Sequence, residues 1–194
     1  MNPKEVSELL RTRRSIFPGN YTGEKVDDAI VEEMLENANW APSNKRTEPW
    51  RFKVFTAAGL TTLAEFQSNL YKELAEKKGT FNEKTYNMLS TKPLKASHVI
   101  AIMMKRDEKE SVPEVEEVEA VAMAVQNMYL TATAHGIGCY WGSGGITYLE
   151  EAKPFFGLGK TDQLLGFLFI GHPKATPETG KRNPIQDKVE WVRS

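Results

Sequence analysis

Residues 134–145 read AHGIGCYWGSGG, the most glycine-dense stretch of the chain. Because glycine carries no side chain, Gly142 and Gly144 let backbone N–H groups approach a flat or anionic ligand. Trp141 places a large apolar face beside them. We therefore expect a short strand over residues 139–141 that leads into a ligand-binding loop.

The segments on either side of this stretch show regular hydrophobic patterns. Apolar residues recur at helical spacing before it and predict a long helix over residues 113–134. His135 follows at its C-terminus, where an imidazole complements the helix dipole, so a capping role is favoured over a catalytic one. After the glycine loop, Thr147 is expected to cap a helix over residues 148–156. The very apolar residues 163–170 predict a buried strand.

The N-terminal half predicts further helices and strands. Thr22 is a candidate N-cap for its second helix, and Pro42 ends that helix. Residues 59–90 either cover a pocket as a mobile lid or form an ordinary surface helix pair, and the sequence favours the ordinary pair. The predicted helices cover residues 3–12, 25–38, 59–78 and 81–89, and the predicted strands cover residues 51–56 and 98–104.

Length, charge and cysteine content limit the possible classes of protein. A chain of 194 residues predicts one domain, here residues 1–194. Its net charge of −1 does not favour broad attraction to nucleic acid or anionic lipid. The single cysteine, Cys139, excludes an internal disulfide and a thiol-based metal cluster. Without a secretion-type N-terminus or an apolar run as long as a membrane span, the sequence predicts a cytoplasmic protein.

Two polar segments are candidates for ligand binding. Arg13, Arg14 and Ser15 follow the first predicted helix, and guanidinium groups bind phosphate through paired hydrogen bonds. Adjacent arginines are also common as solvated charge, and the local sequence does not decide between the two. Residues 40–50 hold two tryptophans and several polar side chains, a composition equally typical of a loop that lines a site and of a solvated connection.

Several catalytic classes lack their motifs in this sequence. No histidine or cysteine spacing fits a metal site, and no nucleophile elbow or phosphate-binding loop is present. That leaves a cofactor that carries the chemistry itself, and a flavin fits best. Its phosphate needs cations, its ring needs flat apolar walls and backbone donors, and its reduced form is stabilised by nearby positive charge.

The order of several motifs resembles the nitroreductase family of FMN enzymes. Arg13-Arg14-Ser15 matches the family's RRS opening, and the Ala41-Pro42-Ser43 and Glu48-Pro49-Trp50-Arg51-Phe52 motifs match its polar loop. Residues 136–144 and 165–173 are similar to its flavin loop and final core strand, and residues 181–184 to its basic tail. The resemblance covers essentially the whole chain.

This resemblance implies a fold, a cofactor and an assembly. The fold is α+β, with a central, mainly antiparallel sheet flanked by helices. The assembly is an intertwined homodimer with FMN at the interface, and the tail of residues 174–194 is expected to pack on the partner subunit. The implied reaction transfers two electrons from NADH or NADPH to FMN and then to a nitroaromatic, quinone or similar small acceptor.

The family's binding residues can be carried over by position. Arg13 and Arg182 are expected to hold the FMN phosphate, with Lys181 as a helper. The remaining candidates are Arg14 and Ser15 near the phosphate, ribityl chain or ring edge, Ser43, Asn44 and Arg46 from the other subunit, and Trp141, Gly142, Ser143 and Gly144 along the ring. No side chain is expected to act as a protein acid or base.

One departure from the family pattern affects the expected chemistry. Many members place a lysine or arginine near the pyrimidine edge of the flavin, where this chain has Phe17. We hypothesise that Arg14 or Arg46 supplies the missing charge. Two other readings stay open: a flavin-binding carrier or sensor with little turnover, and a soluble interaction domain without a cofactor.

Overall fold

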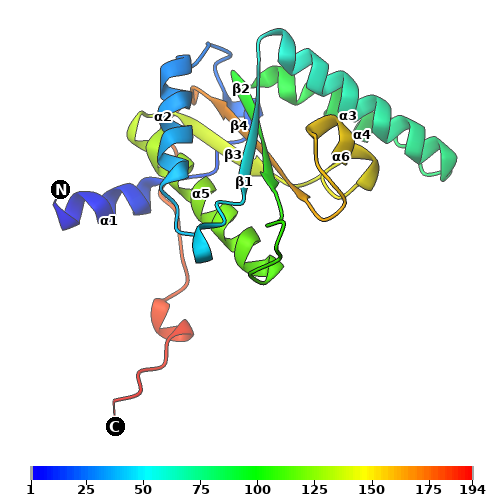
Figure 1. Cartoon of the computed structure of the whole chain (residues 1–194). Helices are drawn as coiled ribbons and strands as arrows, with labels where there is room; N and C mark the ends of the chain where they lie inside the picture. The colour runs from blue at the N-terminus through cyan, green and yellow to red at the C-terminus, as the bar shows by residue number, and fades with distance from the viewer. Residues whose placement is uncertain (1, 194) are drawn as a thin grey trace.

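The computed structural model describes residues 2–193, which form an antiparallel sheet covered by helices on both faces (Figure 1). The four strands lie in the order β1-β2-β4-β3, and every neighbouring pair is antiparallel. Their bounds are β1 Trp50–Thr56, β2 His98–Met104, β3 Gly138–Gly142 and β4 Gln163–Gly171. The α+β class is confirmed, and the predicted strands agree within one residue at each end.

Strand β2 is buried along its whole length because both of its faces pack against helices. Ile100, Ile102 and other even-numbered residues face a core built with helices α2 (Asp28–Asn39) and α5 (Glu114–Ala134). Odd-numbered residues such as Val99 face a second core, built with helix α3 (Ala58–Lys77). This two-sided burial explains why the strand is a continuous apolar run rather than an alternating one.

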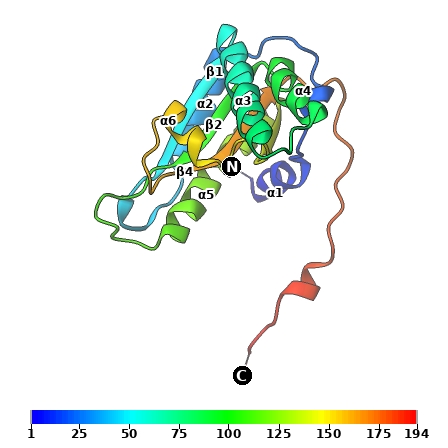
Figure 2. The same cartoon turned by 90° about the vertical axis from the view of Figure 1, so that its right-hand side faces the viewer.

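Helix α1 (Pro3–Thr12) projects from the body and buries none of its residues. It starts where Asn2 and Glu5 form a reciprocal capping box, with Pro3 in the first turn. The C-terminal tail also leaves the body, as Figures 1 and 2 show, and it exposes Ile185 and Trp191. An exposed amphipathic helix and an exposed apolar tail are surfaces that a second chain can cover.

Two predicted helix starts are wrong. Helix α2 begins at Asp28 because the side chain of Asp27, not of Thr22, accepts a hydrogen bond from the backbone of Ala29. Thr147 does not cap a helix over residues 148–156, since its hydroxyl donates to the Gly144 carbonyl oxygen.

The segment after Thr147 is less helical than predicted. It holds a 3-10 turn, Glu150–Ala152, followed by the single-turn helix α6 (Lys153–Phe156). Pro154 suits only a first turn, so it restarts the helix there. Helix α4 (Glu83–Thr91) begins two residues later than predicted, after its Asn82 cap, and pairs with α3 in an arm at the side of the sheet (Figures 1 and 2).

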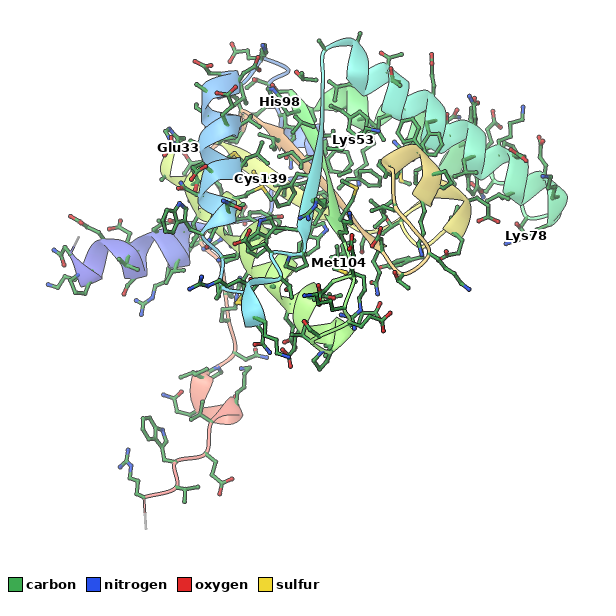
Figure 3. The ribbon with its side chains drawn as sticks, in the orientation of Figure 1. Glu33, Lys53, Lys78, His98, Met104 and Cys139 are labelled. Carbon is green, nitrogen blue, oxygen red and sulfur yellow. The ribbon has the colours of Figure 1, made fainter. Side chains whose placement is uncertain are left out.

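Two expectations about single residues, and one about membrane spans, can be compared with the structure. Cys139 is buried in the interior (Figure 3), and burial raises the pKa of its thiol, so it is a small core residue as predicted. His135 ends α5, and its Nε2 lies 2.9 Å from a carboxylate oxygen of Glu33. Within residues 2–193, no helix is long and apolar enough to cross a membrane.

Candidate functional site

A cleft of about 410 Å³ opens beside the end of α1, over strands β3 and β4. It brings together Arg13, Ser15, Trp141 and Ser143, which come from distant parts of the sequence and were all predicted site residues. The remaining lining residues, which the sequence did not single out for binding, are Val118, Tyr129, Tyr148 and Leu165.

The backbone holds the Arg13 to Ser15 segment against β3. Ser15 forms an isolated parallel bridge with Cys139, and the N–H of Ile16 donates to the Cys139 carbonyl oxygen at 2.8 Å. Because β3 ends at Gly142, this bridge fixes the arginine segment beside the glycine loop. The Arg13 to Ser15 segment and the glycine-rich stretch after β3 therefore lie next to each other in the fold.

Tyr129 of α5 organises the cleft. Its hydroxyl accepts a hydrogen bond from the backbone N–H of Trp141 at 2.7 Å, and the Arg13 guanidinium lies 5.2 Å from the centre of its ring. Burial raises the pKa of Tyr129, while hydrogen bonds from Ser15 and Trp141 oppose that rise. The sequence placed Tyr129 only on the apolar face of a helix, and spacing alone does not reveal its hydroxyl contacts.

Trp141 is fixed by the neighbouring strand. Its indole Nε1–H donates to the Leu165 carbonyl oxygen at 3.0 Å. The next residue, Gly166, has φ +125°, and a Cβ there would lie 2.5 Å from the Gly142 carbonyl oxygen. Only glycine adopts this conformation readily and allows this approach. The indole wall of the cleft therefore depends on a glycine in β4.

Lys92 is a cation that the sequence did not single out. Its Nζ lies 4.7 Å from the ring centre of Tyr140 and 4.6 Å from that of Phe169. A Cβ at Gly142 would lie 3.3 Å from the same nitrogen, so Lys92 reaches the glycine loop. Partial burial lowers the pKa of Lys92, and none of the ion pairs among the described residues involves it.

Phe17, which stands where the resemblance led us to expect a basic residue, packs against the same aromatic group. Its ring centre lies 4.4 Å from that of Tyr140, on which Lys92 also sits. Lys92 and Phe17 therefore share Tyr140 as a neighbour, on the face of β3 opposite Trp141 and the cleft. No local pattern could have shown this, because Lys92 lies 75 positions after Phe17 (92 − 17) in the sequence.

Arg14 does not point into the cleft that Arg13 lines. Its Nε–H donates to the Glu178 carbonyl oxygen at 3.1 Å, and its Nη1 donates to the Arg11 carbonyl oxygen at 2.6 Å and to that of Arg13 at 2.7 Å. These bonds attach the beginning of the tail to the end of α1. Arg14 is thus occupied by backbone oxygens in this chain.

The predicted phosphate residues of the tail lie near this attachment but do not line the cleft. A Cβ at Gly180 would lie 2.5 Å from Arg14 Cζ, so the tail passes directly over that guanidinium. Arg182 is two residues farther along, and its Cα therefore lies within about 7 Å of that of Gly180. Its Nη1 donates to the carbonyl oxygen of Lys181 at 2.7 Å.

The polar loop between α2 and β1 also stays away from the cleft of its own chain. Asn44 donates to a carboxylate oxygen of Glu116 at 2.7 Å, and the hydroxyl of Ser43 accepts from the backbone of Glu48 at 3.3 Å. Lys45, Arg46 and Glu48 have positive φ values of 51°, 56° and 43°. Such clustered strain is typical of functional loops.

Gly142 and Gly144 of the glycine loop, which were also predicted site residues, adjoin the cleft without lining it.

Comparison with known proteins identifies relatives along nearly the whole chain. The sequence model described as "Nitroreductase family" matches residues 10–172. The Bacillus subtilis protein named "Putative NAD(P)H nitroreductase YfhC" is 32% identical over 186 residues, which cover 93% of this chain and 91% of that protein. The Escherichia coli protein named "Putative NAD(P)H nitroreductase YdjA" is 29% identical over 180 residues, which cover 91% of this chain and 93% of that one.

Solved structures agree with the sequence relatives. A nitroreductase-like family protein from Bacillus cereus has a TM-score of 0.83 at 28% identity, over 100% of this chain and 99% of that one. A "putative nitroreductase" from Desulfovibrio desulfuricans, solved in complex with FMN, has a TM-score of 0.71 at 25% identity, over 100% of this chain and 99% of that one. With the model match over most of its length, the chain belongs to the nitroreductase family.

Proposed function

We propose that residues 1–194 form one FMN-binding domain that transfers two electrons from NADH or NADPH to a nitroaromatic, quinone or similar small acceptor. One observation carries the proposal: Arg13, Ser15 and Trp141 converge on a single cleft in a chain of this family. The relatives support the cofactors, since one solved relative holds FMN and the curated relatives are named for NAD(P)H.

The residues of the cleft fit the parts of FMN. A guanidinium and the two serine hydroxyl groups suit a phosphate and a ribityl chain, while an indole gives a flat apolar wall and a leucine adds apolar contact. Within one chain, Arg13 is the cation that lines the cleft. A dianionic phosphate calls for a second cation, and the tail places Arg182 and Lys181 close to the end of α1.

The chain's own groups bind and orient rather than react. Bound FMN supplies the capacity to accept and release a hydride. Trp141 and Leu165 exclude water from one side of the cleft, and the Tyr129 hydroxyl holds the Trp141 backbone in place. Lys92 provides positive charge beside the glycine loop. No side chain in the cleft needs to take up or release a proton.

We further propose that the working unit is a homodimer. Helix α1 buries no residue, and Trp191 and Val192 of the tail are 74% and 83% exposed, which a second copy of the chain would change. The strained loop with Ser43, Asn44 and Arg46 would then reach the cleft of the other copy. This arrangement explains why a loop with site-like composition does not contact its own cleft.

Lys92 does not line the cleft and lies on the opposite face of β3 from Trp141, so its ammonium is expected to raise the reduction potential of the bound flavin only across the Gly142 backbone. Replacing Lys92 by Met should make the midpoint potential more negative by roughly 30 mV, since losing one nearby charge removes about 1.4 kcal/mol of stabilisation from the reduced form. The measurement is a spectroscopic redox titration of both proteins. Arg46→Met serves as the comparison: a shift there, with none for Lys92→Met, would assign the charge to the loop instead.

The proposed function is tested by the absorption spectrum of the purified protein under anaerobic conditions. A bound flavin gives a visible band, and NADH or NADPH should bleach it within a turnover time, with recovery when a quinone is added. A flavin band that neither dinucleotide bleaches would support the carrier or sensor reading. A colourless protein that cannot be reconstituted with FMN would show that the chain does not bind a flavin.

A further inference from the structure

A second groove lies between helix α4 and the turn that follows the RRS motif. Its volume is about 410 Å³, and Phe17 and Lys92, which both contact Tyr140, are among the residues that line it. Lys84, Asn87 and Met88 of α4 also line it, and Lys95 lines it from the turn that follows the helix.

The charged side chains that line this groove are all positive. Lys84, Lys92 and Lys95 line it, and no aspartate or glutamate does. None of the ion pairs among the described residues involves these three lysines. The larger cleft beside Tyr148 differs, since it mixes Lys160 with acidic side chains such as Glu114. Three unpaired ammonium groups around one groove attract an anion.

The groove also offers apolar contact and a suitable length. Phe17 is 55% exposed and Met88 is 46% exposed, so a ligand can cover both side chains. Lys84 and Lys92 are eight positions apart along α4 and the residue after it, which corresponds to about 12 Å. A ligand with a flat body near Phe17 and an anionic group farther out matches this layout.

We propose that this groove binds the phosphate or carboxylate group of a small aromatic redox ligand. The inference rests on the proposed function, because it takes the cleft beside α1, which the glycine loop adjoins, as the place where electrons are exchanged. Two ligands carry the required group: a nicotinamide dinucleotide through its phosphates, and a carboxylated nitroaromatic acceptor. The groove thereby sets which charged donor or acceptor the protein prefers.

The test compares the double variant Lys84→Met/Lys95→Met with a control of equal charge change, Lys78→Met/Lys109→Met. Lys78 lies at the far tip of α3 (Figure 3), and neither control residue lines the groove. Binding of NADP⁺ and of 4-nitrobenzoate to the protein as purified is measured by isothermal titration calorimetry. The kcat/KM values are measured for NADPH, for 4-nitrobenzoate and for uncharged nitrobenzene.

The groove variant is expected to bind at least one anionic probe roughly three- to tenfold more weakly than the control variant does. Its kcat/KM for nitrobenzene should equal that of the control. A loss confined to NADP⁺ and NADPH assigns the groove to the donor, and a loss confined to 4-nitrobenzoate assigns it to the acceptor. Equal values for groove and control variants overturn the proposal. Calorimetry separates this failure from failure of the proposed function, since it needs no turnover.

Discussion

Replacing Arg13 by Ala is expected to lower the affinity of the protein for FMN by about 10- to 100-fold. A hydrogen-bonded charged group contributes about 1.5–3 kcal/mol, and Arg13 is the cation that lines the cleft within one chain. Its guanidinium also covers the Tyr129 ring, so its loss exposes that wall of the cleft to water. The measurement is a fluorescence titration of the apoprotein with FMN.

The matched control for this experiment is Arg11→Ala. Arg11 lies in the last turn of α1, two residues before Arg13, and it is exposed and does not line the cleft. Its replacement removes the same charge and should leave the FMN dissociation constant within about twofold, because an exposed charge contributes little. Equal FMN dissociation constants for the two variants would show that the FMN phosphate does not bind at the end of α1.

Replacing Gly166 by Ala is expected to have two effects: it destabilises the fold, and it displaces the Trp141 wall so that the cleft closes. The added methyl group would lie 2.5 Å from the Gly142 carbonyl oxygen and 2.8 Å from Trp141 Nε1, at a backbone φ of +125°. Strain of this kind costs at least about 2 kcal/mol. Thermal unfolding should shift down by about 4–8 °C, and bound flavin should be lost with it.

Gly59→Ala provides the comparison for this variant. Gly59 lies in helix α3, and a Cβ there would meet nothing closer than 3.9 Å. Alanine is favoured over glycine in a helix, so the melting temperature should stay or rise slightly, with flavin binding intact. A Gly166→Ala protein that melts and binds flavin like Gly59→Ala would show that β4 does not position the indole.

The fold was predictable where the local hydrophobic pattern of a segment determines its secondary structure. The apolar run of β2 and the helical spacing of α5 placed both elements closely, because burial dictates both patterns. The start of α2 was misplaced because Thr22 and Asp27 are both suitable N-caps, and only the fold shows which one meets a free backbone N–H. Pro154 likewise restarts a helix where periodicity predicted a longer one.

The candidate site was predictable in its motifs but not in its spatial neighbours. Arg13, Ser15, Trp141 and Ser143 carry recognisable local sequence, and the structure brings them together. Tyr129 and Lys92 make contacts between distant elements, which no single sequence window contains. Arg14 shows the opposite case, since a motif residue is occupied by the carbonyl oxygens of Arg11, Arg13 and Glu178.

We propose that the cleft beside α1 holds a flavin in an assembly of two chains. Sedimentation velocity of the purified protein, recorded at both the protein and the flavin absorption bands, distinguishes this arrangement from its alternatives. A single boundary that carries flavin and sediments as twice the 21.9 kDa chain is expected. Flavin that sediments with a single chain, or a two-chain species that carries none, would contradict it.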